Sequence, residues 1–155
     1  MDQDKIFLKE AINQANQSMI EGGFPAGAVV VKNGEIISNG ISLGGKLNDP
    51  TEHSETSAIR KACKKLETTD LSGCILYAAL EPCLMCFSVA NWAGIQKIVF
   101  GCKRTESMIK KNFYEGFNNN QDINKNNNRQ IELQYINDFE NEILTIIKEW
   151  ENKVV

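Results

Sequence analysis

The chain is poor in histidine and proline, and it contains no long apolar run. Among its 155 residues are one histidine, three prolines and two tryptophans. No apolar stretch approaches the ~18 residues that a membrane-spanning helix needs. Residues 1–16 alternate charged residues with apolar residues at helical spacing, which is not typical of a signal peptide. We therefore expect a cytoplasmic protein without a membrane partner.

The chain also lacks basic charge and a disulfide pattern. The net charge is −3, so the composition gives no indication of a polyanionic partner. The number of cysteines is five, and an odd number argues against a secreted disulfide framework. Hydrophobic residues at 42% and charged residues at 24% are ordinary globular values. We expect a single domain over residues 1–155.

Hydrophobic spacing predicts a helix and a hairpin in the first third of the chain. Gly22 and Gly23 end the helical pattern, and Asn33-Gly34 separates two apolar runs. Both residues of an Asn-Gly pair tolerate the positive φ angles of a tight hairpin turn. We expect a helix at residues 6–19, two strands at 28–31 and 35–37, and a polar loop at 40–49.

The middle of the chain alternates between helix and strand patterns. We expect helices at residues 53–66 and 83–92, and strands at 74–80 and 97–102. A strand, a helix and a second strand in this order usually form a parallel pair with a crossover helix. The sequence therefore predicts an α/β fold, a three-layer α/β/α sandwich with a mixed central sheet of about five strands.

The last third of the chain is biased in composition. Seven of the eleven residues at 118–128 are asparagine, which we interpret as a solvated loop. Residues 131–136 fit a last strand, and residues 139–150 fit a closing helix with one apolar face. From residue 105 onward, six Lys and Arg stand against nine Asp and Glu.

Two cysteines three residues apart open one of the predicted helices. Cys83 and Cys86 would place both sulfurs on one side of that helix, and Pro82 suits its first position. The amides and the dipole at a helix start favour thiolate, the form that binds zinc. If the cysteine pair is considered alone, it could also be a redox pair or two buried thiols instead of a metal site.

The only histidine, His53, brings the number of candidate zinc ligands to three. The other three cysteines lie singly in predicted helix or strand interiors. Structural zinc sites normally have four protein ligands, whereas three leave a position for water, as in catalytic sites. Glu55 lies two residues beyond His53, where a carboxylate that does not bind the metal can shuttle protons. Both side chains face one site if His53 lies at the non-helical mouth of its helix.

These motifs resemble those of the cytidine-deaminase-like superfamily of zinc deaminases. The pattern H-x-E followed by P-C-x-x-C is a signature of zinc nucleobase deaminases. Residues 48–55 (NDPTEHSE) and 80–86 (LEPCLMC) are similar to the two motifs of guanine deaminases and bacterial tRNA adenosine deaminases. The resemblance implies Glu55 as proton shuttle, a Cys83 amide that helps to hold the attacking oxygen, and a homodimer or larger assembly. The zinc ligands that it implies are His53, Cys83 and Cys86.

Two positions depart from the pattern of these relatives. Ser54 stands between His53 and Glu55, where the relatives usually carry alanine. Ser42 stands where they carry an asparagine that hydrogen-bonds the substrate ring. A hydroxyl makes fewer contacts than a carboxamide, so the substrate is harder to assign by analogy. Ser42 remains our candidate for this contact.

Aromatic residues are the remaining candidates for a substrate pocket. Phe24 and Trp92 have rings that would stack on a flat base, although Trp92 is equally compatible with the core. Phe113 and Tyr114 are further candidates for closing the site, but helix packing explains them as well.

The sequence predicts a zinc-dependent hydrolytic deaminase of a small amino-substituted nucleobase or nucleoside, with release of ammonia. A purine such as guanine is favoured, which would place the enzyme in purine metabolism. A tRNA adenosine-to-inosine deaminase is the alternative, but it needs cationic surface and the last third is acidic. Basic residues do cluster at 60–65 and 97–104. A cytosine or cytidine deaminase and a non-catalytic zinc-stabilised interaction module are further alternatives.

Overall fold

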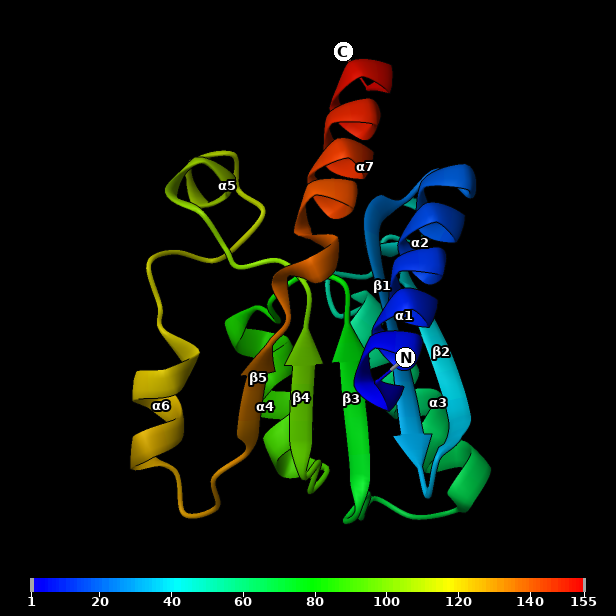
Figure 1. Cartoon of the computed structure of the whole chain (residues 1–155), viewed down its shortest axis with the longest axis vertical. Helices are drawn as coiled ribbons and strands as arrows, with labels where there is room; N and C mark the ends of the chain where they lie inside the picture. The colour runs from blue at the N-terminus through cyan, green and yellow to red at the C-terminus, as the bar shows by residue number, and fades with distance from the viewer. Residues whose placement is uncertain (1, 155) are drawn as a thin grey trace.

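The computed structural model describes residues 2–154, and a mixed five-stranded sheet forms its middle layer (Figure 1). In spatial order the strands are β2 (Glu35–Ser42), β1 (Phe24–Lys32), β3 (Cys74–Ala78), β4 (Lys97–Phe100) and β5 (Glu132–Tyr135). β1 is antiparallel to β2 and β3, whereas β3, β4 and β5 are parallel. The predicted α/β sandwich and its parallel strand pair are confirmed.

The hairpin between β1 and β2 turns where the sequence indicates. Asn33 has a φ of 51° and Gly34 a φ of 76°, both in the left-handed region that these residue types adopt most readily. β2 continues as far as Ser42, which pairs with Phe24. The polar loop predicted at 40–49 is therefore shorter than expected, and it includes the one-turn helix α2 (Gly44–Leu47).

Helices cover both faces of the sheet (Figure 1). The longer ones are α1 (Gln3–Ile20), α3 (Ser54–Leu66), α4 (Leu84–Trp92) and α7 (Glu140–Lys153). The shorter ones are α5 (Glu106–Lys110), α6 (Asn120–Asn126) and a 3-10 turn (Asn137–Phe139). Within residues 2–154, none of the helices combines the length and apolar character that a membrane crossing requires.

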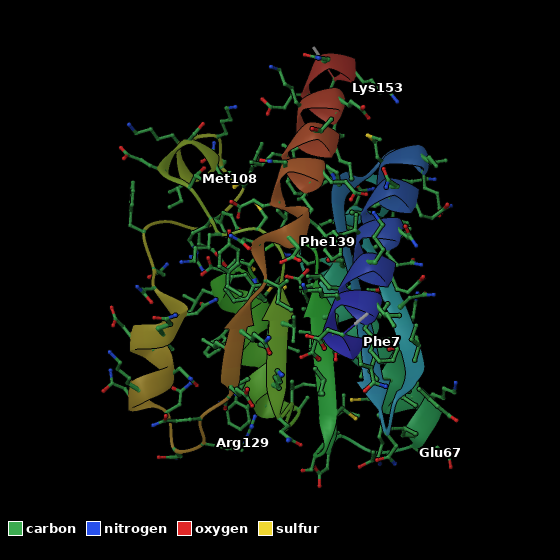
Figure 2. All side chains as sticks on the ribbon, viewed as in Figure 1. Phe7, Glu67, Met108, Arg129, Phe139 and Lys153 are labelled. Carbon is green, nitrogen blue, oxygen red and sulfur yellow. The ribbon has the colours of Figure 1, made fainter. Side chains whose placement is uncertain are left out.

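The core is divided into two layers because side chains alternate along the strands. Val29 of β1 packs with α1 and α7, whereas Val30 packs with α3 and α4. Phe7 of α1 and Phe139, just before α7, belong to the first layer (Figure 2). The start of α4 lies at the carboxyl ends of β3 and β4, which is the end of the sheet from which α7 extends (Figure 1).

The solvated loop predicted at 118–128 is wrong for residues 120–126, which form α6. Asn119 caps this helix, because its side-chain oxygen accepts from the amides of Gln121 and Asp122. Asn120 is buried and donates to the carbonyl oxygen of Pro82. The asparagine side chains therefore replace backbone partners, which is how short polar residues direct local structure.

Candidate active site

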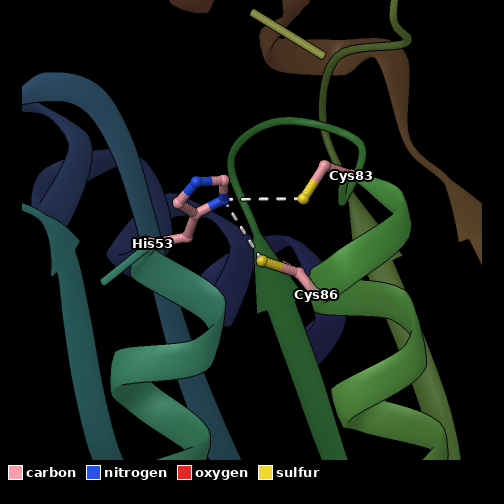
Figure 3. A group of neighbouring side chains, drawn as sticks. All are labelled: His53, Cys83 and Cys86. Carbon is pink, nitrogen blue, oxygen red and sulfur yellow. Dashed lines mark hydrogen bonds between the residues drawn. The ribbon is translucent and has the colours of Figure 1, made fainter. Parts of the chain in front are cut away.

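The predicted metal ligands come from the starts of two neighbouring helices. His53 is the N-cap residue of α3, with φ −89° and ψ 164°, and Cys83 is the N-cap residue of α4, with φ −70° and ψ 172°. Cys86 follows in the first turn of α4. Because the two cap residues have extended backbones, their side chains leave the helix axes and converge with Cys86 (Figure 3). His53 thus lies at the non-helical mouth of its helix, as predicted.

The spacing of the three donor atoms fits a zinc ion. His53 Nδ1 lies 3.5 Å from the Sγ atoms of both Cys83 and Cys86. Tetrahedral zinc with ordinary Zn–N and Zn–S bonds would hold such a pair about 3.6 Å apart. Within residues 2–154 no other trio of His, Cys, Asp or Glu is grouped closely enough to hold a metal ion. The three side chains therefore fit the zinc ion that the sequence predicts.

The two thiols are prepared for metal binding by their neighbours. A hydrogen bond from Cys86, opposed by burial and assisted by His53, lowers the pKa of Cys83 to about 5. The same hydrogen bond and burial raise the pKa of Cys86 well above its ordinary value. The hydrogen bond to Cys83 raises the pKa of His53, although burial acts against it. A bound cation would replace the proton that the two thiols share.

Glu55 lies in the first turn of α3 and is buried. Burial, and then the charge of Cys83, raise the pKa of Glu55, while a hydrogen bond from the Ser54 hydroxyl to its carboxylate acts in the opposite direction. A carboxyl group with a raised pKa is able to take up and return a proton near neutral pH. Glu55 thus has the environment that a proton shuttle requires.

Two of the candidate ligands, His53 and Cys83, line a pocket of about 330 Å³ together with Glu55. Seven candidates from the sequence line it: Phe24, Ser42, His53, Glu55, Cys83, Phe113 and Tyr114. The other lining residues are Ala26, Leu80, Glu81, Lys111, Asn112 and Trp150. The pocket therefore joins the metal-binding side chains to an aromatic wall.

Trp92 is not one of the residues that line this pocket. It is the last residue of α4, at the opposite end of the helix from Cys83, and its side chain is 88% exposed. Both predictions for Trp92, as a substrate-pocket residue and as a core residue, are therefore wrong. The helix carries Trp92 away from the site because its nine residues span about 13 Å at 1.5 Å per residue.

Close contacts fix the pocket wall that β1 and β2 provide. The buried Ser18 hydroxyl donates to the carbonyl oxygen of Phe24 at 2.6 Å and accepts from the amide of Ser42 at 3.0 Å. A Cβ atom at Gly40 would lie 2.0 Å from the carbonyl oxygen of Ser54. Glycine therefore lets the first turn of α3, with His53 and Glu55, pack directly against β2.

Trp150 of α7 is a pocket residue that sequence reasoning missed. The Phe24 ring centroid lies 4.9 Å from that of Phe113 and 5.0 Å from that of Trp150, and both contacts are edge-to-face. Helical spacing identified Trp150 only as part of an apolar face. No local signal in the sequence distinguishes a tryptophan that closes a pocket from one that fills a core.

Arg104 holds the loop that leads into Cys83. It forms an ion pair with Glu81 at 3.3 Å and donates to the Pro82 carbonyl oxygen at 3.1 Å. The Asn120 amide donates to the same carbonyl oxygen at 2.8 Å, and Tyr114 Oη donates to that of Glu81 at 2.8 Å. The ligand loop is thus braced by residues from the last third of the chain, which motif reading did not indicate.

An imidazole and two thiols converge beside a pocket of an α/β/α sandwich that a buried carboxyl group also lines. Three metal ligands and an adjacent carboxyl group are typical of catalytic zinc sites. The chain belongs to the family of the cytidine and deoxycytidylate deaminase zinc-binding region, whose model matches residues 1–102. The family is a zinc-binding one, and the donor set of His53, Cys83 and Cys86 is consistent with that metal.

The relatives are named for more than one kind of substrate, including adenosine in tRNA, guanine and cytosine. A tRNA-specific adenosine deaminase of Aquifex aeolicus is 45% identical over 94 residues, and a guanine deaminase of Bacillus subtilis is 43% identical over 102 residues. These matches cover 61% and 65% of this chain and 62% and 65% of the relatives, so the chain spans less than two thirds of their length. A solved structure from work on A-to-I editing by tRNA:A34 deaminases at the wobble position of transfer RNA has a TM-score of 0.78 and 26% identity, covering 92% of this chain and 99% of that one.

Proposed function

We propose that this protein is a zinc-dependent deaminase of a small amino-substituted nucleobase or nucleoside, with a purine such as guanine favoured. The observation that carries the proposal is the pocket of about 330 Å³, which Glu55, His53 and Cys83 line together with the rings of Phe24, Phe113 and Trp150. A flat heterocycle suits such a wall, because aromatic side chains stack against ring faces. The guanine deaminase among the relatives supports the same substrate class.

Each residue of the site has a role in this reaction. Zinc would supply the Lewis acid that makes water a nucleophile at neutral pH. The Glu55 carboxylate would take one proton from the attacking water and pass it to the ring nitrogen, and would then take the second proton from the new hydroxyl group and give it to the departing amine. Phe24 and Trp150 would orient the ring, and the Ser42 hydroxyl would hydrogen-bond its edge. Ammonia and the oxo product would then leave.

A tRNA adenosine deaminase is the second candidate, supported by the relative that is 45% identical to this chain. Most of the basic side chains that would contact RNA are engaged within the protein. Arg60 pairs with Glu52 at 2.7 Å, and Lys61 and Lys65 donate to carbonyl oxygens of β2 at 3.2 and 3.3 Å. Phosphate binding would have to compete with these partners. This arrangement favours a small substrate over an RNA.

The basic side chains of the second cluster, at residues 97–104, also have partners within the protein. Lys97 pairs with Asp4 at 3.1 Å, and Arg104 is occupied by Glu81 and Pro82. Lys103 lies over the ring of Tyr135, 4.8 Å from its centroid. The cluster is therefore better explained as part of the intramolecular packing than as a phosphate-binding surface.

Ammonia release from zinc-loaded protein tests the proposal. The panel is guanine, guanosine, adenine, adenosine, cytosine and cytidine, with an anticodon stem-loop RNA as a separate arm and Glu55→Gln as the inactive control. Release from a purine supports the proposal. Release from the RNA alone would establish the tRNA candidate, and release from a cytosine compound would indicate a pyrimidine enzyme. Stoichiometric zinc without turnover in any arm would favour the interaction module.

The assembly and location are part of the same proposal. We infer a homodimer, which is supported by α4, a helix that is apolar except for Ser88 and Asn91 and ends in the exposed Trp92. Light scattering tests this, because Trp92→Asp should shift the mass from dimer toward monomer. A cytoplasmic location is supported by five cysteines that are all free thiols.

A further inference from the structure

The helix that carries both cysteines receives its cap from another part of the chain. An N-cap side chain usually accepts a hydrogen bond from an amide of the first helical turn. Cys83 occupies that position in α4 but makes no capping hydrogen bond, because its Sγ faces His53. Glu115 accepts instead, with Oε1 3.3 Å from the amide of Leu84 and Oε2 3.1 Å from the amide of Met85.

The other ligand-bearing helix is capped locally. His53 is the N-cap residue of α3, and its own amide donates at 3.0 Å to the hydroxyl of Thr56 in the first turn. Both helices therefore have a metal ligand at the position where a capping side chain normally stands. In α3 the capping contact from Thr56 to the His53 amide is local, whereas the first-turn amides of α4 are capped by a residue about 30 positions further along the chain.

Glu115 is held in place by the two residues before it. Phe113 packs edge-to-face against Phe24 in the pocket wall, and Tyr114 donates to the carbonyl oxygen of Glu81. Arg104 lies 4.7 Å from the centroid of the Tyr114 ring. The stretch from Phe113 to Glu115 thus joins the substrate wall, the loop before Cys83 and the first turn of α4.

We propose that Glu115 is a positioning residue for the zinc site, which orients Cys83 and Cys86 toward His53 by capping α4 from the pocket wall. Its two oxygens are directed to backbone amides, and it is not part of the trio whose donor atoms converge. A carboxylate is well suited to this role, because it accepts two hydrogen bonds and complements the positive end of the helix dipole. The inference rests on the zinc site of the proposed function.

Zinc affinity, measured by competition with a chromophoric chelator, tests the role without requiring turnover. Glu115→Ala should weaken zinc binding about tenfold or more, as is typical when a group that orients metal ligands is removed. Glu115→Gln should weaken it less, because the amide keeps one acceptor. The matched control is Glu106→Gln, which removes the same charge from α5, where Glu106 pairs only with the exposed Lys110. The control should bind zinc as the wild type does.

Thermal unfolding separates a positioning role from a general structural role. If Glu115 orients the thiolates, its loss should lower the melting temperature of the zinc-loaded protein more than that of the zinc-free protein. Equal decreases in the two forms with unchanged zinc affinity would overturn the proposal, and so would an equal loss of affinity in Glu106→Gln. If Glu115→Ala does not fold, Glu115→Gln gives the same readouts. A wild type that binds zinc but deaminates nothing would refute the proposed function and leave this test intact.

Discussion

Residues 2–102 and residues 103–154 contribute different parts of the same pocket. The first region carries the candidate metal ligands and Glu55 at the starts of α3 and α4. The second region carries much of the aromatic wall and Arg104, which braces the ligand loop. The family model ends at residue 102, so its match includes the candidate metal ligands and Glu55 but not the second region. Motifs in the first region predict chemistry, whereas they do not reach the part of the pocket wall that the second region supplies.

The largest expected effect belongs to the first region. Glu55→Gln should lower turnover by about 10²- to 10⁴-fold, because the amide cannot take up a proton, and it should leave zinc content unchanged. Ammonia release and elemental analysis of the same sample measure the two quantities. His53→Ala is the contrasting variant and should lose zinc as well as turnover. Normal turnover in Glu55→Gln would show that the proton shuttle lies elsewhere.

The second region should affect stability through Arg104. Arg104→Ala removes one partner of a largely buried ion pair and two hydrogen bonds to backbone carbonyls, and should lower the free energy of unfolding by about 3 kcal/mol. Urea denaturation at neutral pH measures this change. The control is Lys110→Ala, whose exposed pair with Glu106 should contribute less than about 1 kcal/mol. Equal effects of the two variants would mean that the brace is not important for stability.

Within the first region, Ser54 tests a residue at which this chain departs from its relatives. The Ser54 hydroxyl donates to the Glu55 carboxylate and thereby opposes the rise in its pKa. Ser54→Ala should raise the pKa of Glu55 further, so that less of the basic form is present in acid. Turnover should fall about tenfold at the acidic end of the pH profile and recover as the pH rises.

The ratio of the Ser54→Ala rate to the wild-type rate, measured across the pH profile, checks this prediction. Zinc would lower the pKa of Glu55 in both proteins, so the sign of the difference does not depend on it. The control is Ser57→Ala, which changes a buried serine on the same helix. A ratio that is constant with pH would mean that Ser54 does not influence the charge of Glu55.

The metal site was predictable from the sequence because its signals are local. The spacing of Cys83 and Cys86, and of His53 and Glu55, fixes which side chains share a helix start, and the strand–helix–strand order fixes where those starts meet. Glu115 has no comparable signal, because its partners are backbone amides about 30 residues away. The asparagine-rich segment was misinterpreted because composition indicates solvation, whereas its structure depends on individual hydrogen bonds.

The smallest expected effect separates substrate binding from chemistry. Trp150→Ala removes two edge-to-face contacts in the pocket wall, each of which contributes about 0.5 to 1.5 kcal/mol in aromatic pairs. We expect KM to rise about fivefold with little change in kcat, because Trp150 orients the ring and takes no part in proton transfer. The control is Leu144→Ala, a half-exposed residue on the same helix and outside the pocket. A fall in kcat at constant KM would place Trp150 with Glu55 in the chemical step, and would remove the division between the two regions.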